Sequence, residues 1–216
     1  MKVCGYTNLY SNPSFEGDSF LPTSSPVSLS TEWSASGTRS VRITSPGTGS
    51  SDIFADLSYL ARDIFGGITA PTDFTILAKA RIDTPLSGVE DTNRYRNIYL
   101  YHAGPASFYY SPSVPNTTGV HEIRYKVTLT RTPTFFRLYS GHSIGSIWWD
   151  DLLVIKGDYD GPYFDGNSAN AEWTGTPHAS TSVLKEFVDA PTKVYDGSTW
   201  QDATIKRYDG TNWITT

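Results

Sequence analysis

The sequence predicts an all-β protein, a β-sandwich of the jelly-roll type that is followed by small hairpins. The 216 residues include 18 Gly and 13 Pro, which disfavours long helices and favours short strands joined by turns. Aromatic residues make up 14% of the chain, so they can fill a core although aliphatic residues are sparse. Several segments alternate between apolar and polar residues, which is the period of a strand with one buried face.

The alternating segments lie between Asn8 and Ile155 and define the first domain, residues 1–157. In Phe74–Ile82 every second residue is apolar, whereas Lys79 and Arg81 face the other way. The other predicted strands are Val27–Leu29, Ser40–Ile43, Asn97–Tyr101, His121–Leu129, Phe135–Tyr139 and Ile147–Ile155. One short helix is expected around Asp56–Phe65, because a Gly-Gly pair follows it.

The alternation stops after residue 157. Residues 158–190 are rich in Gly, Asp, Asn, Ser and Thr, yet they keep Tyr159, Tyr163, Phe164 and Trp173. A segment that retained no order would not keep so many aromatic rings, so we expect an ordered but irregular connection. Within it, Val183–Val188 has the pattern of a strand or a short helix.

Residues 191–216 contain a repeat, since Tyr195-Asp-Gly-Ser-Thr-Trp200 returns as Tyr208-Asp-Gly-Thr-Asn-Trp213. Asp-Gly favours a tight hairpin turn, and the flanking Tyr and Trp give the two arms large side chains to pack together. Hairpins of this size cannot bury a core alone, so this end of the chain is expected to dock on a neighbour.

Composition disfavours several classes of partner. The chain has 17 Lys and Arg against 22 Asp and Glu, a net charge of −5, and no basic cluster. Nucleic acids and anionic membrane surfaces are therefore not expected partners. The single cysteine, Cys4, excludes an intrachain disulfide and a cysteine-based zinc site. No signal peptide and no membrane-spanning run of apolar residues is recognisable.

The strongest enzyme-like motif is Gly141-His-Ser-Ile-Gly145, which matches the nucleophile elbow G-x-S-x-G. That elbow requires a helix after the motif, but the next residues have the pattern of a strand. We therefore expect a turn between two strands and no enzymatic activity. The four histidines have no zinc-binding spacing. Paired glycosidase carboxylates stay open, because their separation is spatial rather than sequential.

Two sets of segments resemble known families. Asn8–Gly17, Trp33 with Ser36–Ile43, and Trp148–Leu153 resemble the carbohydrate-binding jelly rolls of the galactose-binding-like superfamily. Gly161–Gly166 and Glu172–Thr181 resemble minor tail proteins of long-tailed phages that infect actinobacteria, and the Tyr-Asp-Gly-x-x-Trp repeat is similar to the ends of phage tail proteins.

The second resemblance implies a virion protein of the tail that is assembled in the cytoplasm of the bacterial host. Its implied partners are other tail proteins and host cell-wall polysaccharide. A homotrimer is usual in tail fibres, although no coiled-coil heptad here specifies one. Binding would be non-covalent and weak per site, and several copies on one particle would strengthen it.

The jelly-roll resemblance also implies a structural calcium ion that fastens the start of the chain to the last core strand. Calcium prefers carboxylate and carbonyl oxygens, and Glu16 offers one carboxylate. Asp150 or Asp151 offers another; we expect Asp151, because only one of two adjacent side chains on a regular strand can face the ion. The alternative is that the two aspartates cap a sheet edge and that Glu16 is solvated.

Sugar recognition needs flat aromatic rings and planar hydrogen-bonding groups. Tyr95, Asn97, Tyr99 and Tyr101 share one face of a predicted strand, and Arg137 and Tyr139 share a face of another. Further candidates are Trp33 and the loop aromatics Phe108, Tyr109 and Tyr110. The alternative for each ring is burial against the opposing sheet.

The two leading functions are accordingly a tail-tip protein that binds a host glycan and a structural tail adaptor that binds no sugar. The binding module of a secreted polysaccharide-degrading enzyme is a third, weaker possibility.

Overall fold

The computed structural model describes residues 2–17, 26–46, 53–87, 96–104, 106–141, 144–188, 193–195, 198–202, 206–208 and 213–215. The chain divides into a large unit, Tyr6–Leu184, and a small unit that comprises Met1–Gly5 and Lys185–Thr216. In the described part of the chain, no helix has the length and apolar character needed to cross a membrane.

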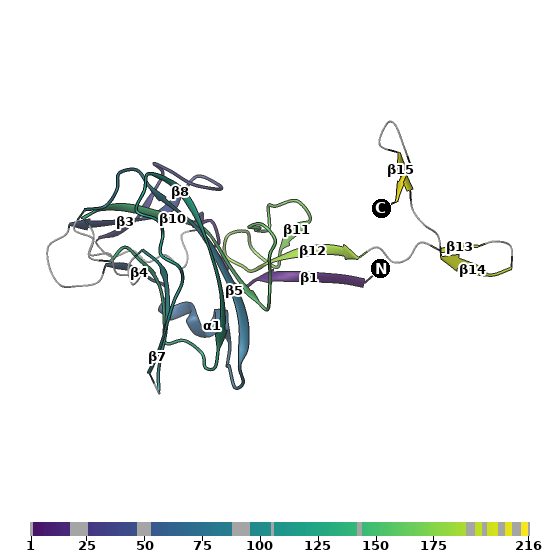
Figure 1. Cartoon of the computed structure of the whole chain (residues 1–216), viewed down its shortest axis with the longest axis horizontal. Coiled ribbons are helices and arrows are strands. Elements are labelled where there is room, and N and C mark those ends of the chain that lie inside the picture. The colour runs from purple at the N-terminus through teal and green to yellow at the C-terminus, as the bar shows by residue number, and fades with distance from the viewer. Residues whose placement is uncertain are drawn as a thin grey trace. The chain divides into compact units, whose positions relative to one another are not determined.

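The large unit is a sandwich of two antiparallel sheets, which confirms the predicted all-β jelly roll (Figure 1). The first sheet has the order β2-β3-β10-β5-β8, and the second has the order β4-β9-β6-β7. The strands of the first are β2 (Val27–Ser30), β3 (Ser40–Pro46), β10 (Ile144–Lys156), β5 (Thr72–Ile82) and β8 (Gly119–Leu129). Those of the second are β4 (Phe54–Asp56), β9 (Phe135–Tyr139), β6 (Ile98–Ala103) and β7 (Ala106–Tyr110).

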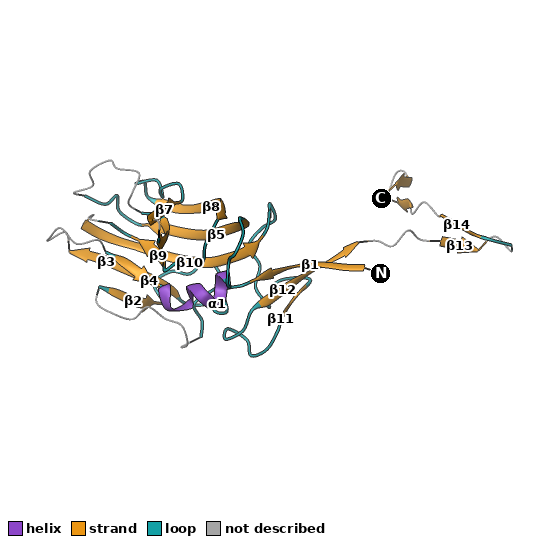
Figure 2. Cartoon of the chain, turned by 90° about the horizontal axis from the view of Figure 1, so that it is seen from below, coloured by secondary structure: helices purple, strands orange, loops and turns teal. Residues whose placement is uncertain are grey.

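The core lies between these two sheets and follows the predicted alternation. Ile76, Ala78 and Ala80 of β5 are buried in it, opposite Leu100 and Phe136 of the second sheet. The predicted helix is present in shortened form, as η1 (Ser58–Leu60) and α1 (Ala61–Phe65), which ends at Gly66 with a φ of 64° (Figure 2, purple).

Phe65 at the end of α1 fills the space between the layers. Its ring centre lies 5.2 Å from that of Phe74 in β5 and 5.4 Å from that of Phe136 in β9. The helix therefore joins the two sheets through one aromatic side chain.

A second, smaller core lies on the outer side of the first sheet. Leu77, Leu153 and Ile155 point away from the main core, and Tyr159 and Phe164 cover them. The segment predicted to be irregular, 158–190, also contains two paired strands, β11 (Ala171–Trp173) and β12 (Ser182–Val188), and β1 (Lys2–Asn8) completes the order β1-β12-β11. Residues 158–184 lie within the large unit, Tyr6–Leu184.

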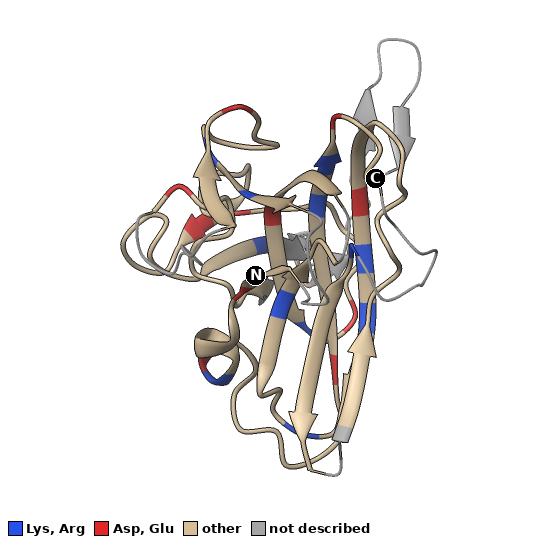
Figure 3. Cartoon of the chain, turned by 90° about the vertical axis from the view of Figure 1, so that its left-hand side faces the viewer, with Lys and Arg blue, Asp and Glu red and all other residues tan. Residues whose placement is uncertain are grey.

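One arginine of the first sheet holds this covering segment in place. Arg124 of β8 donates hydrogen bonds of 2.9 Å from Nη1 to the backbone oxygen of Tyr159 and from Nη2 to that of Gly161. In the view of Figure 3, acidic and basic positions are scattered along the strands and loops.

The small unit contains the two predicted hairpins. β13 (Lys193–Tyr195) pairs with β14 (Trp200–Asp202), and β15 (Lys206–Tyr208) pairs with β16 (Trp213–Thr215). Tyr195 lies opposite Trp200, and Tyr208 opposite Trp213, as the repeat predicts. The Asp-Gly pairs that were expected to form the turns lie outside the described residues.

The loop assignment of Phe108, Tyr109 and Tyr110 is wrong, since these residues form the second half of β7. The G-x-S-x-G motif connects β9, which ends at Tyr139, to β10, which begins at Ile144, so strands flank it on both sides as expected. His142 and Ser143 themselves lie outside the described residues.

Candidate functional site

The outer side of the second sheet carries a group of aromatic side chains that belong to neither core. We call this group the aromatic face; it consists of Phe54, Tyr99, Tyr101, Phe108, Tyr110, Phe135, Arg137 and Tyr139. Alternation along each strand produces it. In β6 and β9 the neighbouring residues Leu100, Phe136 and Leu138 point inward to the core.

The rings form two rows that cross the strands. In the first row Phe54 stacks on Tyr139 at 5.2 Å, and Tyr139 contacts Tyr99, also at 5.2 Å. Tyr110 continues this row at 5.1 Å from Tyr99. In the second row Tyr101 lies between Phe135, at 5.3 Å, and Phe108, at 5.0 Å. Such cross-strand pairs stabilise the sheet and also form a continuous aromatic surface.

Arg137 joins the two rows. Its guanidinium carbon lies 3.9 Å from the ring centre of Phe54 and 4.0 Å from that of Phe135. The Nη2 atom is 3.4 Å from a carboxylate oxygen of Asp56. Stacking on both sides fixes the plane of the guanidinium, so its N–H groups keep a defined direction.

Exposure differs across the face. Phe108 is 57% exposed, whereas Tyr99 and Tyr139 are only 7% and 6% exposed, and Tyr101 and Phe135 are half-buried. Burial, together with Tyr110 and Tyr139 beside it, raises the pKa of Tyr99 to about 12. Its hydroxyl therefore stays protonated at neutral pH and can donate a hydrogen bond.

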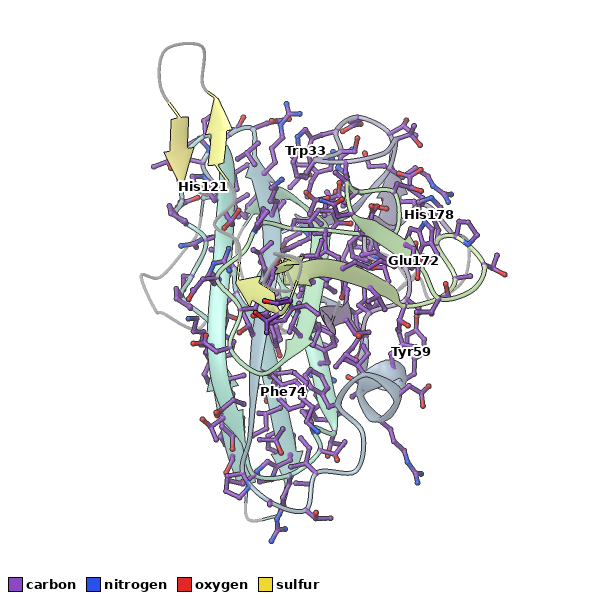
Figure 4. All side chains as sticks on the ribbon, turned by 90° about the vertical axis from the view of Figure 1, so that its right-hand side faces the viewer. Trp33, Tyr59, Phe74, His121, Glu172 and His178 are labelled. Atoms are coloured by element: carbon purple, nitrogen blue, oxygen red, sulfur yellow. The ribbon has the colours of Figure 1, made fainter. Side chains whose placement is uncertain are left out.

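The structure brings together four of the six predicted sugar-contacting residues, namely Tyr99, Tyr101, Arg137 and Tyr139. Asn97 is completely buried, and its backbone oxygen accepts a 2.9 Å hydrogen bond from Tyr139, so its side chain is not at the surface. Trp33 lies in the loop between β2 and β3 of the other sheet and is not part of the aromatic face (Figure 4).

Sequence reasoning missed the two phenylalanines that flank Arg137. Phe135 has the same parity as Arg137 and Tyr139, so the alternation in β9 could have identified it. Phe54 belongs to a strand of three residues, which is too short to give a periodic signal. Tyr109, named with Phe108 and Tyr110, packs against the main core instead.

The predicted calcium ligands lie on the opposite side of the sandwich and hold the loop between β2 and β3. Glu16 accepts hydrogen bonds of 2.6 Å from the backbone N–H groups of Thr38 and Arg39 and of 2.7 Å from the Thr38 hydroxyl. Burial acts to raise its pKa, but the hydrogen bonds from Thr38 and Arg39 outweigh burial and lower the pKa of Glu16.

Asp150 and Asp151 bind the same loop through a β-bulge. The pairing of β10 with β5 shifts between Asp150 and Leu153, and Asp151 has a φ of 52°. Asp150 accepts hydrogen bonds from the backbone N–H groups of Ala35 and Ser36, at 2.6 and 3.2 Å, and Asp151 accepts one from the Ser36 hydroxyl at 2.5 Å. Because the bulge adds one residue to the strand, both adjacent aspartates contact this loop. Which of them would face a calcium ion stays a prediction.

The carboxylates of Glu16, Asp150 and Asp151 make direct contacts within the protein. In the described ranges, no three His, Cys, Asp or Glu side chains are grouped closely enough to hold a metal ion. The donors around them are N–H and O–H groups, and the cation beside Asp151 is Lys79, with its Nζ 2.7 Å from Oδ2. Calcium binding stays a prediction of the resemblance, and the geometry favours direct hydrogen bonds in its place.

The raised pKa of Asp150 predicts that the stability of the folded protein depends on pH. Burial first, and then the charge of Asp151, raises the pKa of Asp150 to about 8, from an ordinary value of 3.8. Between these two values the folded protein holds a proton that the unfolded chain has released, so stability is lost as pH rises towards about 8. Asp150→Asn keeps an acceptor for Ala35 and Ser36 and carries no charge. We expect this variant to melt higher than the parent at about pH 9 and to lack the parent's slope; a lower melting temperature there would contradict the assignment.

Comparison with known proteins supports the fold. No family model and no curated protein matches the chain. Among solved structures, "Family 16 Carbohydrate Binding Module-2" superposes on 68% of the chain and 99% of its own length, with 13% identity and a TM-score of 0.50.

Two further structures are similar at lower TM-scores. The CBM22-1 xylan-binding domain from Paenibacillus barcinonensis Xyn10C matches 71% of the chain and 94% of its own length, with 8% identity and a TM-score of 0.42. The "Xylan-Binding Domain from CBM 22" matches 69% and 94%, with 14% identity and a TM-score of 0.43. The two-sheet architecture and the match to the Family 16 module show that the chain has the jelly-roll sandwich fold.

Proposed function

We propose that the chain binds a glycan non-covalently on the aromatic face. The observation that carries this proposal is the two rows of aromatic rings around Arg137, which belong to neither hydrophobic core. Tyr99 and Tyr139 are buried within the rows, whereas Tyr101 and Phe135 are partly exposed and Phe108 is exposed. Exposed apolar surface of this kind indicates a binding site. The rings suit the apolar C–H faces of sugars, and Arg137 and the tyrosine hydroxyls suit their oxygens.

The ligand class we propose is a polysaccharide with accessible pyranose faces. The Family 16 carbohydrate-binding module shares the fold over 68% of this chain. The mild acidity of the chain, with a net charge of −5, favours a neutral chain over a polyanion. The aromatic face contains one cation, Arg137, and Asp56 accompanies it.

We further propose that the chain acts in the tail of a phage and binds a cell-wall polysaccharide of the bacterial host. The resemblance of residues 161–181 to minor tail proteins and the repeated Tyr-Asp-Gly-x-x-Trp hairpins support this role. Weak single sites would then act together on one particle. Mass spectrometry of purified virions should find the chain as a stoichiometric component, and its absence would exclude this role.

A structural adaptor is the second candidate, and the small unit favours it. Each of its hairpins has strands of only three residues, and isolated hairpins of this kind are not stable in water. They need a partner, which a neighbouring tail protein would provide. The electrophoretic mobility of an adaptor that binds no sugar should not change in the presence of any polysaccharide.

Affinity electrophoresis in gels that contain xylan, galactan, mannan or β-glucan separates these two candidates. We expect at least one polysaccharide to retard the protein. Tyr101→Ala and Arg137→Ala should each weaken retardation about tenfold or more, a loss typical of a central binding residue. Tyr59→Ala removes an equally large exposed ring on η1, outside the two rows, and should have no effect. Equal retardation of all four proteins would contradict the proposal.

A further inference from the structure

The side of the sandwich opposite the aromatic face contains a polar cavity of about 330 Å³. We call this cavity the polar pocket; its lining includes Ser36, Lys79, Asp151, Asp165, Asn167 and His178. Lys79 and Asp151 come from the outer side of the first sheet, and Ser36 from the loop between β2 and β3. The remaining three belong to the segment that follows β10. The volume is at the lower end of the range for small-molecule sites.

Close backbone packing builds the pocket. A Cβ atom on Gly17 would overlap the backbone oxygen of His178, so only glycine allows the segment around His178 to lie against the N-terminal loop. A Cβ atom on Gly166 would likewise overlap the ring of Trp173. The pocket therefore lies where the N-terminal loop and the segment around His178 pack closely together.

His178 is the residue best placed to meet a ligand. Its φ is 57°, a conformation that costs energy for a non-glycine residue and that is often found at functional sites. Its Nδ1 lies 3.4 Å from the Ser14 hydroxyl and its Nε2 3.5 Å from the Asn167 side-chain nitrogen. Both distances are at the long limit of hydrogen bonding. A ligand oxygen could therefore replace Ser14 or Asn167 as the hydrogen-bond partner of His178 with little loss of free energy.

The pocket contains one cation, Lys79, and two carboxylates, those of Asp151 and Asp165. Lys79 is paired with Asp151 at 2.7 Å, so it offers no free cation for a phosphate or carboxylate. Asp165 accepts hydrogen bonds from the Asn167 backbone at 2.9 Å and the Ser168 hydroxyl at 3.1 Å. Burial, followed by Asp151 and Asp165, raises the pKa of Tyr163 well above its ordinary value, so its hydroxyl is a neutral donor.

This lining discriminates among classes of ligand. Donors and acceptors are mixed at close spacing, which suits a molecule that carries several hydroxyl groups. The side chains that define the pocket are polar, which disfavours a lipid or an aromatic ligand. No metal-binding group of side chains occurs there among the residues that the structure describes.

We propose that the polar pocket binds a single neutral sugar ring, as a second carbohydrate site on the side of the sandwich opposite the aromatic face. This inference goes beyond the proposed function, which concerns the aromatic face alone. His178, Asn167 and Ser36 would exchange hydrogen bonds with ring hydroxyls, while the Lys79–Asp151 pair would donate and accept at the base of the pocket. A polysaccharide-binding sandwich would then contact glycan from two sides.

NMR of the imidazole groups in the full chain tests the proposal. The protein is titrated separately with D-xylose, D-glucose, D-galactose, D-mannose and N-acetyl-D-glucosamine. His178→Gly identifies the His178 signal and suits the positive φ, so it removes the ring without backbone strain. His121 on β8 is the matched internal control, since it lies far from His178 (Figure 4).

We expect at least one sugar to shift the His178 signal in a saturable way, with His121 unchanged. Asn167→Ala should weaken that response about tenfold, the loss of one good hydrogen bond, and Tyr101→Ala should leave it intact. No saturable shift with any of the five sugars, or an equal shift of His121, would overturn the proposal. If a polysaccharide retards the protein but no sugar shifts the His178 signal, the pocket proposal is wrong and glycan binding on the aromatic face is still supported. If a sugar shifts the His178 signal but no polysaccharide retards the protein, only the proposal for the aromatic face is wrong.

Discussion

Replacing Lys79 by Met is expected to lower the free energy of unfolding by about 3 kcal/mol, because it leaves a buried carboxylate without its partner. Asp151 is 1% exposed and Lys79 is 31% exposed at their side chains, with 2.7 Å between Nζ and Oδ2. The partial exposure of Lys79 places the effect at the low end of the range for buried ion pairs. Urea denaturation measures the change.

A second substitution makes this expectation specific. The double variant Lys79→Met with Asp151→Asn removes both charges and should recover most of the lost stability. A loss below about 1 kcal/mol in the single variant would mean that the pair behaves like an ordinary surface ion pair.

The same denaturation experiment tests calcium. With the parent protein, a chelator should leave the transition unchanged, because hydrogen bonds and Lys79 already satisfy Glu16 and Asp151. An ion held at a thousandfold excess over its dissociation constant would contribute about 4 kcal/mol. A loss of that size on chelation would show that the metal fastens the loop after all.

Phe164→Ala is expected to destabilise the protein by about 3–5 kcal/mol, the usual cost of removing a buried aromatic side chain. Phe164 is 2% exposed, and its ring lies 5.9 Å from that of Tyr159 over Leu77 and Leu153. The variant should therefore unfold in one transition at lower urea concentration. Its segment 158–184 should also become sensitive to protease.

Phe108→Ala is the matched control, because it removes an identical ring that is 57% exposed. Its effect should stay within about 0.5 kcal/mol. Phe164→Ala could instead make segment 158–184 sensitive to protease without changing the urea midpoint of the sandwich. That result would show that the second, smaller core folds separately from the sandwich.

The sequence allowed prediction of those parts of the fold that depend on alternation. The inward row of β5, the shared outer row of Tyr99 and Tyr101, and the matching row of Arg137 and Tyr139 all follow from a period of two. Leu77 shows the limit of this reasoning. It lies on the outer side of β5, yet it is completely buried, because a segment without periodicity folds over it.

The rest of the site depends on features that a period cannot reveal. The bulge at Asp151 adds one residue to β10 and turns two adjacent carboxylates to one side. The sequence did not predict β7 because Phe108, Tyr109 and Tyr110 are all aromatic. Their side chains alternate between the two sides of the sheet, but their residue types do not alternate between apolar and polar. The polar pocket joins residues that are far apart in the sequence. Its His178 also contacts Ser14, 164 positions away, and only the tertiary packing at Gly17 brings the two segments together.

Hydroxyl-radical footprinting of the protein, free and bound to a polysaccharide that retards it, locates the glycan-binding surface. We expect protection of residues 99–101, 108–110 and 135–139, with exposed Tyr59 reacting equally in both states. Protection confined to other surfaces, with these three segments unchanged, would contradict the assignment of glycan binding to the aromatic face.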